Sequence, residues 1–256
     1  MDYIETNQES WDKRTEIHFT SKMYDVDGFL KGKSSLKEIE LAELTDVEGR
    51  RLLHLQCHFG LDTLSWARRG GIVTGVDFSP TAIDKANELK AKSGINAEFV
   101  CSTIQDLKAE RPGGYDIVFV SYGALCWLPD LGDWARIVSE NLSVGGQLCL
   151  VEFHPIHDVI SGYPYFHGSE PDVGEEGTYT ENCPGEKMKL ATWTHPISDV
   201  LNSLIESGIR IDRFNEYPFS PYNCFENLEE RESGRYCLSD SNHPSPLVFS
   251  VCGTKL

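Results

Sequence analysis

The chain has 256 residues, 40% of them hydrophobic, and a formal net charge of −17 at pH 7. This charge argues against a nucleic-acid partner, because affinity for nucleic acid comes largely from Lys and Arg side chains that neutralise phosphates. No apolar run approaches the roughly 20 residues that span a bilayer, and the polar, acidic N-terminus is unlike a signal peptide. We therefore expect a cytoplasmic protein that contacts neither nucleic acid nor a membrane, with its eight cysteines reduced.

Residues 1–50 precede the first predicted strand. Their apolar side chains, among them Trp11, Phe19, Tyr24 and Phe29, are too numerous for a disordered tail. We predict that this segment packs on the rest of the protein as a helical extension or cap.

The stretch from Arg51 to Asp77 predicts a strand, a tight turn, a helix and a second strand. A short apolar run leads into the turn, apolar residues then recur at helical spacing until Gly70-Gly71, and a β-branched strand ends on Asp77. This pattern is typical of the first βα turn of a doubly wound α/β sheet. In such sheets an acid at the end of the second strand accepts hydrogen bonds from a ribose, and the ligand lies across the carboxyl ends of the strands.

The turn Gln56-Cys57-His58-Phe59-Gly60 contains a single glycine. A dinucleotide needs a glycine-rich turn whose backbone approaches the pyrophosphate closely, and the Cβ atoms of Gln56 and His58 would crowd a diphosphate. S-Adenosylmethionine carries no phosphate and makes weaker demands on this turn. The turn therefore favours S-adenosylmethionine over NAD.

The rest of the chain continues the alternation of strands and helices. Ser79 and Pro80 predict the start of a helix, as its N-cap and first-turn residues. A helical stripe over residues 197–205 is ended by Gly208. Further strands are predicted over residues 97–101, 115–120, 147–154, 209–211 and 246–251.

Two long segments interrupt this alternation. Residues 155–195 contain clustered acidic residues, prolines and glycines, and a loop of this length within a compact domain is usually functional. Within it, Thr178–Thr180 and Met188–Trp193 are predicted to pair as a hairpin around Pro184-Gly185. Residues 217–245 form a second long loop. We interpret both segments as a lid over the carboxyl ends of the strands.

Arg51 to His154 resembles a class I S-adenosylmethionine-dependent methyltransferase of the small-molecule type. The first motif of that family, hydrophobic-x-D-x-G-x-G-x-G, is present in altered form, with His54 at the position of the acid and Gln56 and His58 at two of the glycines. This form is similar to that of a bacterial group whose first motif reads L-Q-C-H-F-G-x-D-T. The second motif (73–79), the fourth (115–121) and the following strand (145–152) are intact.

The resemblance implies a Rossmann-like, mostly parallel sheet with helices on both faces and an antiparallel last strand at the edge. Residues 51–256 would form the methyltransferase domain, with the insertion 155–195 and the loop 217–245 as its lid. Residues 1–50 would either cover the cofactor and shape the acceptor pocket or cap the edge of the sheet.

The resemblance also implies S-adenosyl-L-methionine as cofactor and a small molecule as methyl acceptor, with transfer by in-line displacement. Thr103 occupies the position of the acid in the adenine-binding motif, so its hydroxyl contacts the adenine amino group or that contact is absent. Ile104 would flank the ring, and Ser121 would lie beside the methionine moiety. The predicted cofactor-binding residues are Gln56, Cys57, His58, Gly60, Asp62, Thr63, Asp77, Phe78, Ser79, Thr103, Ile104 and Ser121.

Methyl transfer relies mainly on positioning, and an O, C or protonated N acceptor also needs a base. The candidates near the predicted pocket are His154, His157, Glu152 and His195. We select His154 as a catalytic residue, because it ends the fifth strand at the edge of the sheet where ligands bind. Tyr122 borders the reaction centre in the resembled family and is the second predicted catalytic residue.

A metal site is not predicted. In an extended strand His54 and His58 lie about 13 Å apart, at roughly 3.3 Å per residue, too far to share one ion. His154 and His157 lack a third ligand at helical spacing and an intervening glutamate.

Three functional classes remain: a small-molecule methyltransferase, a catalytically silent protein that binds S-adenosylmethionine, and an NAD-dependent enzyme. The altered first motif and Thr103 keep the second class open. The turn between the first strand and the first helix of the sheet disfavours the third.

Overall fold

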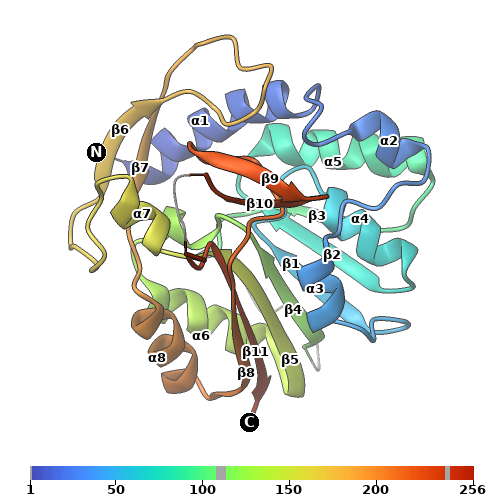
Figure 1. The fold of residues 1–256 in the computed structure, drawn as a ribbon. Helices are drawn as coiled ribbons and strands as arrows, with labels where there is room; N and C mark the ends of the chain where they lie inside the picture. Colours follow the sequence, from blue (N-terminus) through green and yellow to red (C-terminus); the bar gives the residue numbers. More distant parts are fainter. Residues whose placement is uncertain (1, 108–113, 240–242) are drawn as a thin grey trace.

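The computed structural model describes residues 2–107, 114–239 and 243–256, and its centre is a seven-stranded sheet (Figure 1). The strand order is β3-β2-β1-β4-β5-β11-β8. Neighbouring strands run parallel except at β11, which is antiparallel to both β5 and β8. The predicted mostly parallel sheet with an antiparallel last strand is confirmed. The strands are β1 (Arg51–Leu55), β2 (Ile72–Asp77), β3 (Glu98–Cys101), β4 (Tyr115–Ser121), β5 (Leu142–Phe153), β8 (Ile209–Tyr217) and β11 (Val248–Lys255).

The prediction that the last strand lies at the edge of the sheet was wrong, because β11 lies between β5 and β8. The first six residues of β11 are buried, as in a strand with neighbours on both sides. In β8 exposed charged residues such as Arg210 and Asp212 alternate with more buried ones, a composition that suits an edge strand. The sequence 209–217 therefore supplies the polar edge, and 248–255 fills the interior position.

Helices cover both faces of the sheet. Successive residues of β1 point to opposite faces, so that Leu53 and Leu55 join one hydrophobic core and Leu52 joins the other. The first core is closed by α6 (Leu131–Asn141) and α8 (Ile197–Glu206). The second is closed by α2 (Val26–Leu30), α3 (Glu38–Glu43), α4 (Leu61–Arg68) and α5 (Pro80–Ser93). Within the described ranges, no helix combines the length and the apolar composition that crossing a membrane requires.

Helix α5 begins as its sequence predicts. The Ser79 hydroxyl accepts a hydrogen bond from the Ala82 amide over 3.0 Å, and Pro80 occupies the first turn. Strand β5 begins earlier than predicted, at Leu142, because the backbone bulges at Gly145 (φ +76°) and then resumes its pairing with β4.

The N-terminal segment contains a long helix, α1 (Tyr3–His18), which packs against α5 and against the insertion (Figure 1). The insertion contains a short helix, α7 (Ile156–Ile160), and two antiparallel strands, β6 (Asp172–Glu176) and β7 (Met188–Thr192). The side-chain amide of Asn7 donates to the Ala191 carbonyl (2.8 Å) and accepts from the Ala191 amide (2.9 Å). One residue of α1 therefore continues the hydrogen bonding of β7.

The predicted hairpin of the insertion has the correct second strand and the wrong first strand. Strand β7 pairs with β6, whereas Thr178–Thr180 belongs to the connecting loop. The side chain of Thr178 contacts His18, and the Thr180 carbonyl accepts from the Cys183 amide, so these residues are used in a turn. The predicted loop 217–245 contains a second hairpin, β9 (Leu228–Glu232) and β10 (Arg235–Leu238), while residues 240–242 lie outside the described part of the chain.

A buried carboxylate connects α3 to β8 and β11. Glu43 accepts hydrogen bonds from Ser250 (2.7 Å), Tyr217 (2.8 Å), Asn215 (2.7 Å) and Arg213 (2.7 Å). Burial alone would raise its pKa, but these four donors outweigh burial and lower the pKa of Glu43 to about 2. The N-terminal segment is thus anchored to β8 and β11 by a single side chain.

Replacing Glu43 with alanine should lower the free energy of unfolding by about 3 kcal/mol at pH 7, because several buried donors lose their partner. The pKa of Glu43 is lower in the folded protein than its ordinary value of 4.5, so this difference should be present above that pH and disappear as the pH falls toward 2. Urea unfolding at several pH values measures it. Glu38→Ala, which removes an exposed pair with Arg235, should cost less than about 1 kcal/mol. Equal losses for the two variants would contradict the role of Glu43.

Candidate functional site

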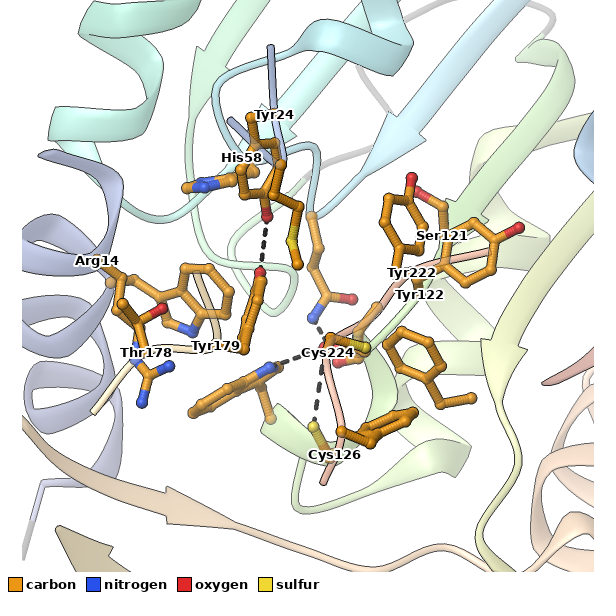
Figure 2. A pocket seen from close by; sticks show the side chains of 18 of the residues that line it. Arg14, Tyr24, His58, Ser121, Tyr122, Cys126, Thr178, Tyr179, Tyr222 and Cys224 are labelled. Carbon is orange, nitrogen blue, oxygen red and sulfur yellow. Dashed lines mark hydrogen bonds between the residues drawn. The ribbon is translucent and has the colours of Figure 1, made fainter. Parts of the chain in front are cut away.

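A cavity of about 1270 Å³ lies at the carboxyl ends of β1, β2 and β4 (Figure 2). Its walls come from α1, the turn after β1, the loop after β4, the insertion and residues 222–227. Pockets for a single drug-sized ligand usually have volumes of about 300–1,000 Å³. The cavity therefore has room for a cofactor and a second small molecule.

The turn after β1 keeps a left-handed backbone at three alternate positions. Gln56, His58 and Gly60 have φ values of +53°, +51° and +76°. A Cβ atom at Gly60 would lie 2.5 Å from Phe99, so only glycine fits there. Gln56 and His58 adopt the same region at a cost of about 1–2 kcal/mol each. The turn thus combines the backbone of a glycine-rich turn with two large side chains.

Contacts on either side compensate for this strain. The Gln56 side chain donates to the Ala124 carbonyl over 2.7 Å and holds the turn to the loop after β4. The His58 ring lies against Trp11, with 5.2 Å between ring centroids, and its Nε2 is 3.0 Å from His18 Nδ1. The turn is therefore packed against α1 as well as against the sheet.

Asp77 ends β2 beside this turn. Its Oδ2 accepts from the His58 amide (2.8 Å) and its Oδ1 from the Ser79 amide (3.0 Å). The side chain is largely buried, with the residue 8% exposed, and it lines the cavity. Burial raises the pKa of the Asp77 carboxyl to about 6. Each carboxylate oxygen has a further lone pair with which to accept from a ligand hydroxyl.

His54 occupies the position at which the resembled family has an acid. Its Nδ1 is 2.8 Å from the Thr63 hydroxyl and its Nε2 is 3.2 Å from the Ser121 hydroxyl. Burial lowers the pKa of His54 to about 3, so the ring is neutral at pH 7. His54 therefore fixes Ser121, at the end of β4, without adding a charge to the site.

The structure brings most, but not all, of the predicted cofactor residues to the cavity. Thr63, Ser79, Thr103 and Ile104 are not among the residues that line it. The Thr103 hydroxyl donates to Asp106 Oδ2 (2.8 Å) and accepts from the Asp106 amide (3.0 Å), so it is engaged in a local turn. The predicted residues that do line the cavity are Gln56, Cys57, His58, Gly60, Asp62, Asp77, Phe78, Ser121 and Tyr122.

The expectation that His154 faces the cavity is corrected by its contacts. Its Nε2 lies 2.9 Å from Glu216 Oε1, and its Nδ1 accepts from the Ile156 amide over 3.1 Å. Both ring nitrogens therefore bind the scaffold, and His154 is not among the cavity-lining residues. The reason is that β5 ends at Phe153, so the side chain of the next residue turns toward β8 and the start of α7.

Of the four histidine and glutamate candidates named from the sequence, His157 is the one that lines the cavity. Its ring stacks on Phe225, with 3.7 Å between centroids, and burial lowers its pKa. The Glu152 carboxylate accepts from the amides of Gly123, Ala124 and Leu125 and holds the loop after β4.

The part of the chain that contains β1 to β4 matches a known family. Residues 52–146 match a family described as "Methyltransferase domain". Over these residues, which are fewer than half of the chain, the protein is similar to methyltransferase domains. The match and the shared fold described next support a class I S-adenosylmethionine-dependent methyltransferase.

Known proteins resemble the chain over different lengths. A ubiquinone biosynthesis O-methyltransferase from Xanthomonas euvesicatoria pv. vesicatoria (strain 85-10) is 30% identical over 133 residues, which are 51% of this chain and 55% of that protein. The chain thus spans about half the length of the curated relatives it matches. The structure of an S-adenosylmethionine-dependent methyltransferase from Mesorhizobium loti shares the fold (TM-score 0.60, 20% identity, covering 88% of this chain and 100% of that one). So does a geranyl diphosphate methyltransferase in complex with GPP and sinefungin (TM-score 0.58, 15% identity, 86% and 77% covered).

Most of the cavity wall that the sequence analysis missed lies outside residues 52–146, the segment that matches the family. Trp11 reaches the cavity from α1. Arg14 also reaches it from α1, Tyr179 from the insertion and Tyr222 from the loop after β8 (Figure 2). Their only sequence signal is in α1, where Trp11, Arg14 and His18 recur at positions that share one helix face. The other two residues lie in segments without regular periodicity, so no pattern marks them.

The strain at His58 is testable by comparing two small residues at the same position. Both His58→Gly and His58→Ala lose the ring, but glycine adopts φ +51° without the Cβ penalty. The glycine variant should therefore be more stable than the alanine variant by about 1–2 kcal/mol in urea unfolding. At Lys90, inside α5, the same two substitutions serve as the control. There the alanine variant should be more stable than the glycine variant by about 0.5–1 kcal/mol. An alanine variant as stable as the glycine variant at position 58 would show that the turn is not strained.

Proposed function

We propose that this protein transfers the methyl group of S-adenosyl-L-methionine to a small-molecule acceptor by in-line displacement. The observation that carries the proposal is the position of Asp77. Its carboxylate lines the cavity at the end of β2 and is held by the amide of His58 in the left-handed turn. The match of residues 52–146 to a methyltransferase domain supports the same conclusion.

The residues at this end of the cavity fit S-adenosylmethionine. Asp77 would accept from the ribose hydroxyls, and Ser121 and the Gln56–Gly60 turn would lie along the methionine moiety. Gln56 Oε1 has no hydrogen-bond partner among the described residues, which leaves an acceptor beside the cavity for the ammonium group of that moiety. The Cβ atoms at Gln56 and His58 stand where a dinucleotide site needs glycine, which argues against an NAD-dependent enzyme.

The bound cofactor supplies an electrophilic methyl group on a sulfonium, and the chain supplies position, enclosure and a base. Aromatic residues of α1 and the insertion line the site, and closure of these segments over a bound cofactor would exclude water from it. His157 is our candidate base, because its ring lines the cavity and its lowered pKa keeps it unprotonated at pH 7. Tyr122 lines the same cavity, but its hydroxyl donates to Glu40 over 2.7 Å, which assigns it a positioning role.

Replacing Asp77 with alanine should weaken S-adenosylmethionine binding at least about tenfold, because charge-assisted hydrogen bonds to the ribose diol are lost. Isothermal titration calorimetry measures the affinity. Asp116→Ala is the matched control, since Asp116 also accepts a backbone amide, from Arg51 over 2.8 Å, but lies at the opposite end of the strands. Unchanged affinity in the Asp77 variant would remove this residue from the site. Tight binding by the wild type without S-adenosylhomocysteine release across a broad acceptor screen would favour the catalytically silent binder.

We also propose that residues 3–24 of the N-terminal segment and the insertion 155–195 close over the cavity as one unit. They contact each other through Asn7 and Ala191, through the hydroxyls of Tyr24 and Tyr179 (2.6 Å), and through Asn182, whose amide donates to the Ile17 carbonyl (2.9 Å). All three contacts join the two segments to each other. Helix α1 is also bonded to the main domain, where the Gln8 side-chain amide donates to the Phe78 carbonyl (2.6 Å) and Asp12 accepts from the Thr81 amide (3.2 Å).

Hydrogen exchange should therefore slow in α1 and in β6 and β7 together when S-adenosylhomocysteine binds, since closure orders both parts. Helix α8, on the face of the sheet away from α1, provides the internal control and should not change. Protection that is equal with and without ligand would make both segments fixed parts of the fold. Protection of one segment alone would show that they move separately.

A further inference from the structure

Arg14 is a buried cation with no carboxylate within ion-pair distance among the described residues. It lies on α1, is 4% exposed, and lines the cavity. Its Nε donates to the Ser10 hydroxyl over 3.3 Å. Within the described part of the chain, its terminal nitrogens have no hydrogen bond and no carboxylate lies within ion-pair distance of them. The Glu176 carboxylate attracts Arg14 from beyond that distance and accepts from the Tyr163 hydroxyl (3.2 Å).

The other buried charges of the protein have partners, which makes Arg14 unusual here. Glu43 accepts from four side chains, Glu152 from backbone amides of the loop after β4, and Asp77 from two amides. A guanidinium stays protonated in proteins, so burial cannot neutralise it. Burying a charge without a close partner is unfavourable, and an anionic ligand in the cavity would offset that cost.

We propose that Arg14 binds a carboxylate group of the methyl acceptor, so that the acceptor is a small organic acid. This inference rests on the proposed methyltransferase function. A guanidinium presents two parallel N–H donors that match the two oxygens of a carboxylate. Trp11 provides an aromatic surface next to this charge, with its ring centroid 5.9 Å from Arg14 Cζ, and the body of an acid would pack on it.

The position of Arg14 assigns the carboxylate to the acceptor and not to the cofactor. In Figure 2 Arg14 lies on the side of the pocket occupied by Thr178 and Tyr179, and Ser121 and Tyr122 lie on the opposite side. Its electrostatic neighbours are Tyr179, Glu176, Cys126, Cys183 and His18, none of which belongs to the Gln56–Gly60 turn or to β2, although His18 contacts His58 of the turn. The methionine end of the cofactor is expected along that turn, so Arg14 is available to the second molecule.

The test uses benzoate and acetate as anionic probes and benzamide as a neutral analogue of benzoate. Calorimetry with cofactor-free protein and with protein saturated with S-adenosylhomocysteine should show that benzoate binds the wild type more tightly than benzamide. Arg14→Gln should weaken benzoate binding at least about tenfold and leave benzamide unchanged, because only the charged pair is lost. Lys13→Gln, which removes a positive charge from the exposed face of the same helix, should leave both affinities unchanged.

A second measurement needs no variant. In wild-type protein the side-chain N–H resonances of Arg14 should shift as acetate is added, since acetate is small enough to enter any carboxylate site. Arg14→Lys keeps the positive charge but loses the two parallel N–H donors of the guanidinium. It should bind benzoate with an affinity between those of the wild type and Arg14→Gln. Arg14-independent binding of benzoate, or no shift of the Arg14 resonances with acetate, would overturn the proposal.

The two possible sources of the carboxylate are separated with 5′-methylthioadenosine, which lacks the amino-acid end of the cofactor. If Arg14→Gln weakens binding of S-adenosylhomocysteine but not of methylthioadenosine, the carboxylate is the cofactor's and the proposal is wrong. Equal affinities of Arg14→Gln and wild type for S-adenosylhomocysteine support it. Failure of S-adenosylhomocysteine to bind the wild type would instead overturn the proposed function, while the probes in cofactor-free protein still report on Arg14.

Discussion

The backbone amide of His58 donates to the Asp77 carboxylate, and the arrangement of the site depends on this hydrogen bond. It joins the turn after β1 to the end of β2, so that the turn and the acid have a fixed relation. The left-handed backbone at His58 is what directs the amide toward Asp77. A carboxylate held in this way is pre-oriented for a ligand and needs no reorganisation when one binds. The acid alone would be a common feature of α/β sheets, whereas the acid with its amide partner forms a specific site.

The side chains of the turn explain how it tolerates the loss of two glycines. Gln56 bonds to the loop after β4, and His58 packs between Trp11 and His18 of α1. A glycine at either position would relieve the backbone but leave the turn unconnected to these neighbours. The large side chains thus impose local backbone strain, and their contacts with the parts of the chain that close the cavity offset it.

The sequence predicted the elements whose signals are local. Asp77 at the end of a β-branched strand and the Ser79 cap followed by Pro80 are where their patterns put them. The order of the last two strands was not predictable in this way, because it depends on which of them pairs with β5, and that pairing is not a local property of either strand. The direction of the His154 side chain depends on where β5 ends. The strand ends at Phe153, one residue before its predicted end, so His154 does not follow the alternation of the strand. Tyr179 reaches the cavity through tertiary packing, which leaves no local signal in the sequence, and Arg14 is marked only by sharing one face of α1 with Trp11 and His18.

The hydrogen bonds between Asn7 and Ala191 have a consequence for solubility. Strand β7 belongs to a two-stranded sheet, and its outer edge would otherwise present unpaired backbone groups to other molecules. By occupying the amide and the carbonyl of Ala191, the Asn7 side chain blocks that edge at its centre. A chain that lacks α1 would carry an open strand edge next to apolar side chains. On such a surface identical molecules can pair strand to strand. The first helix therefore covers the strand edge at which such pairing would begin.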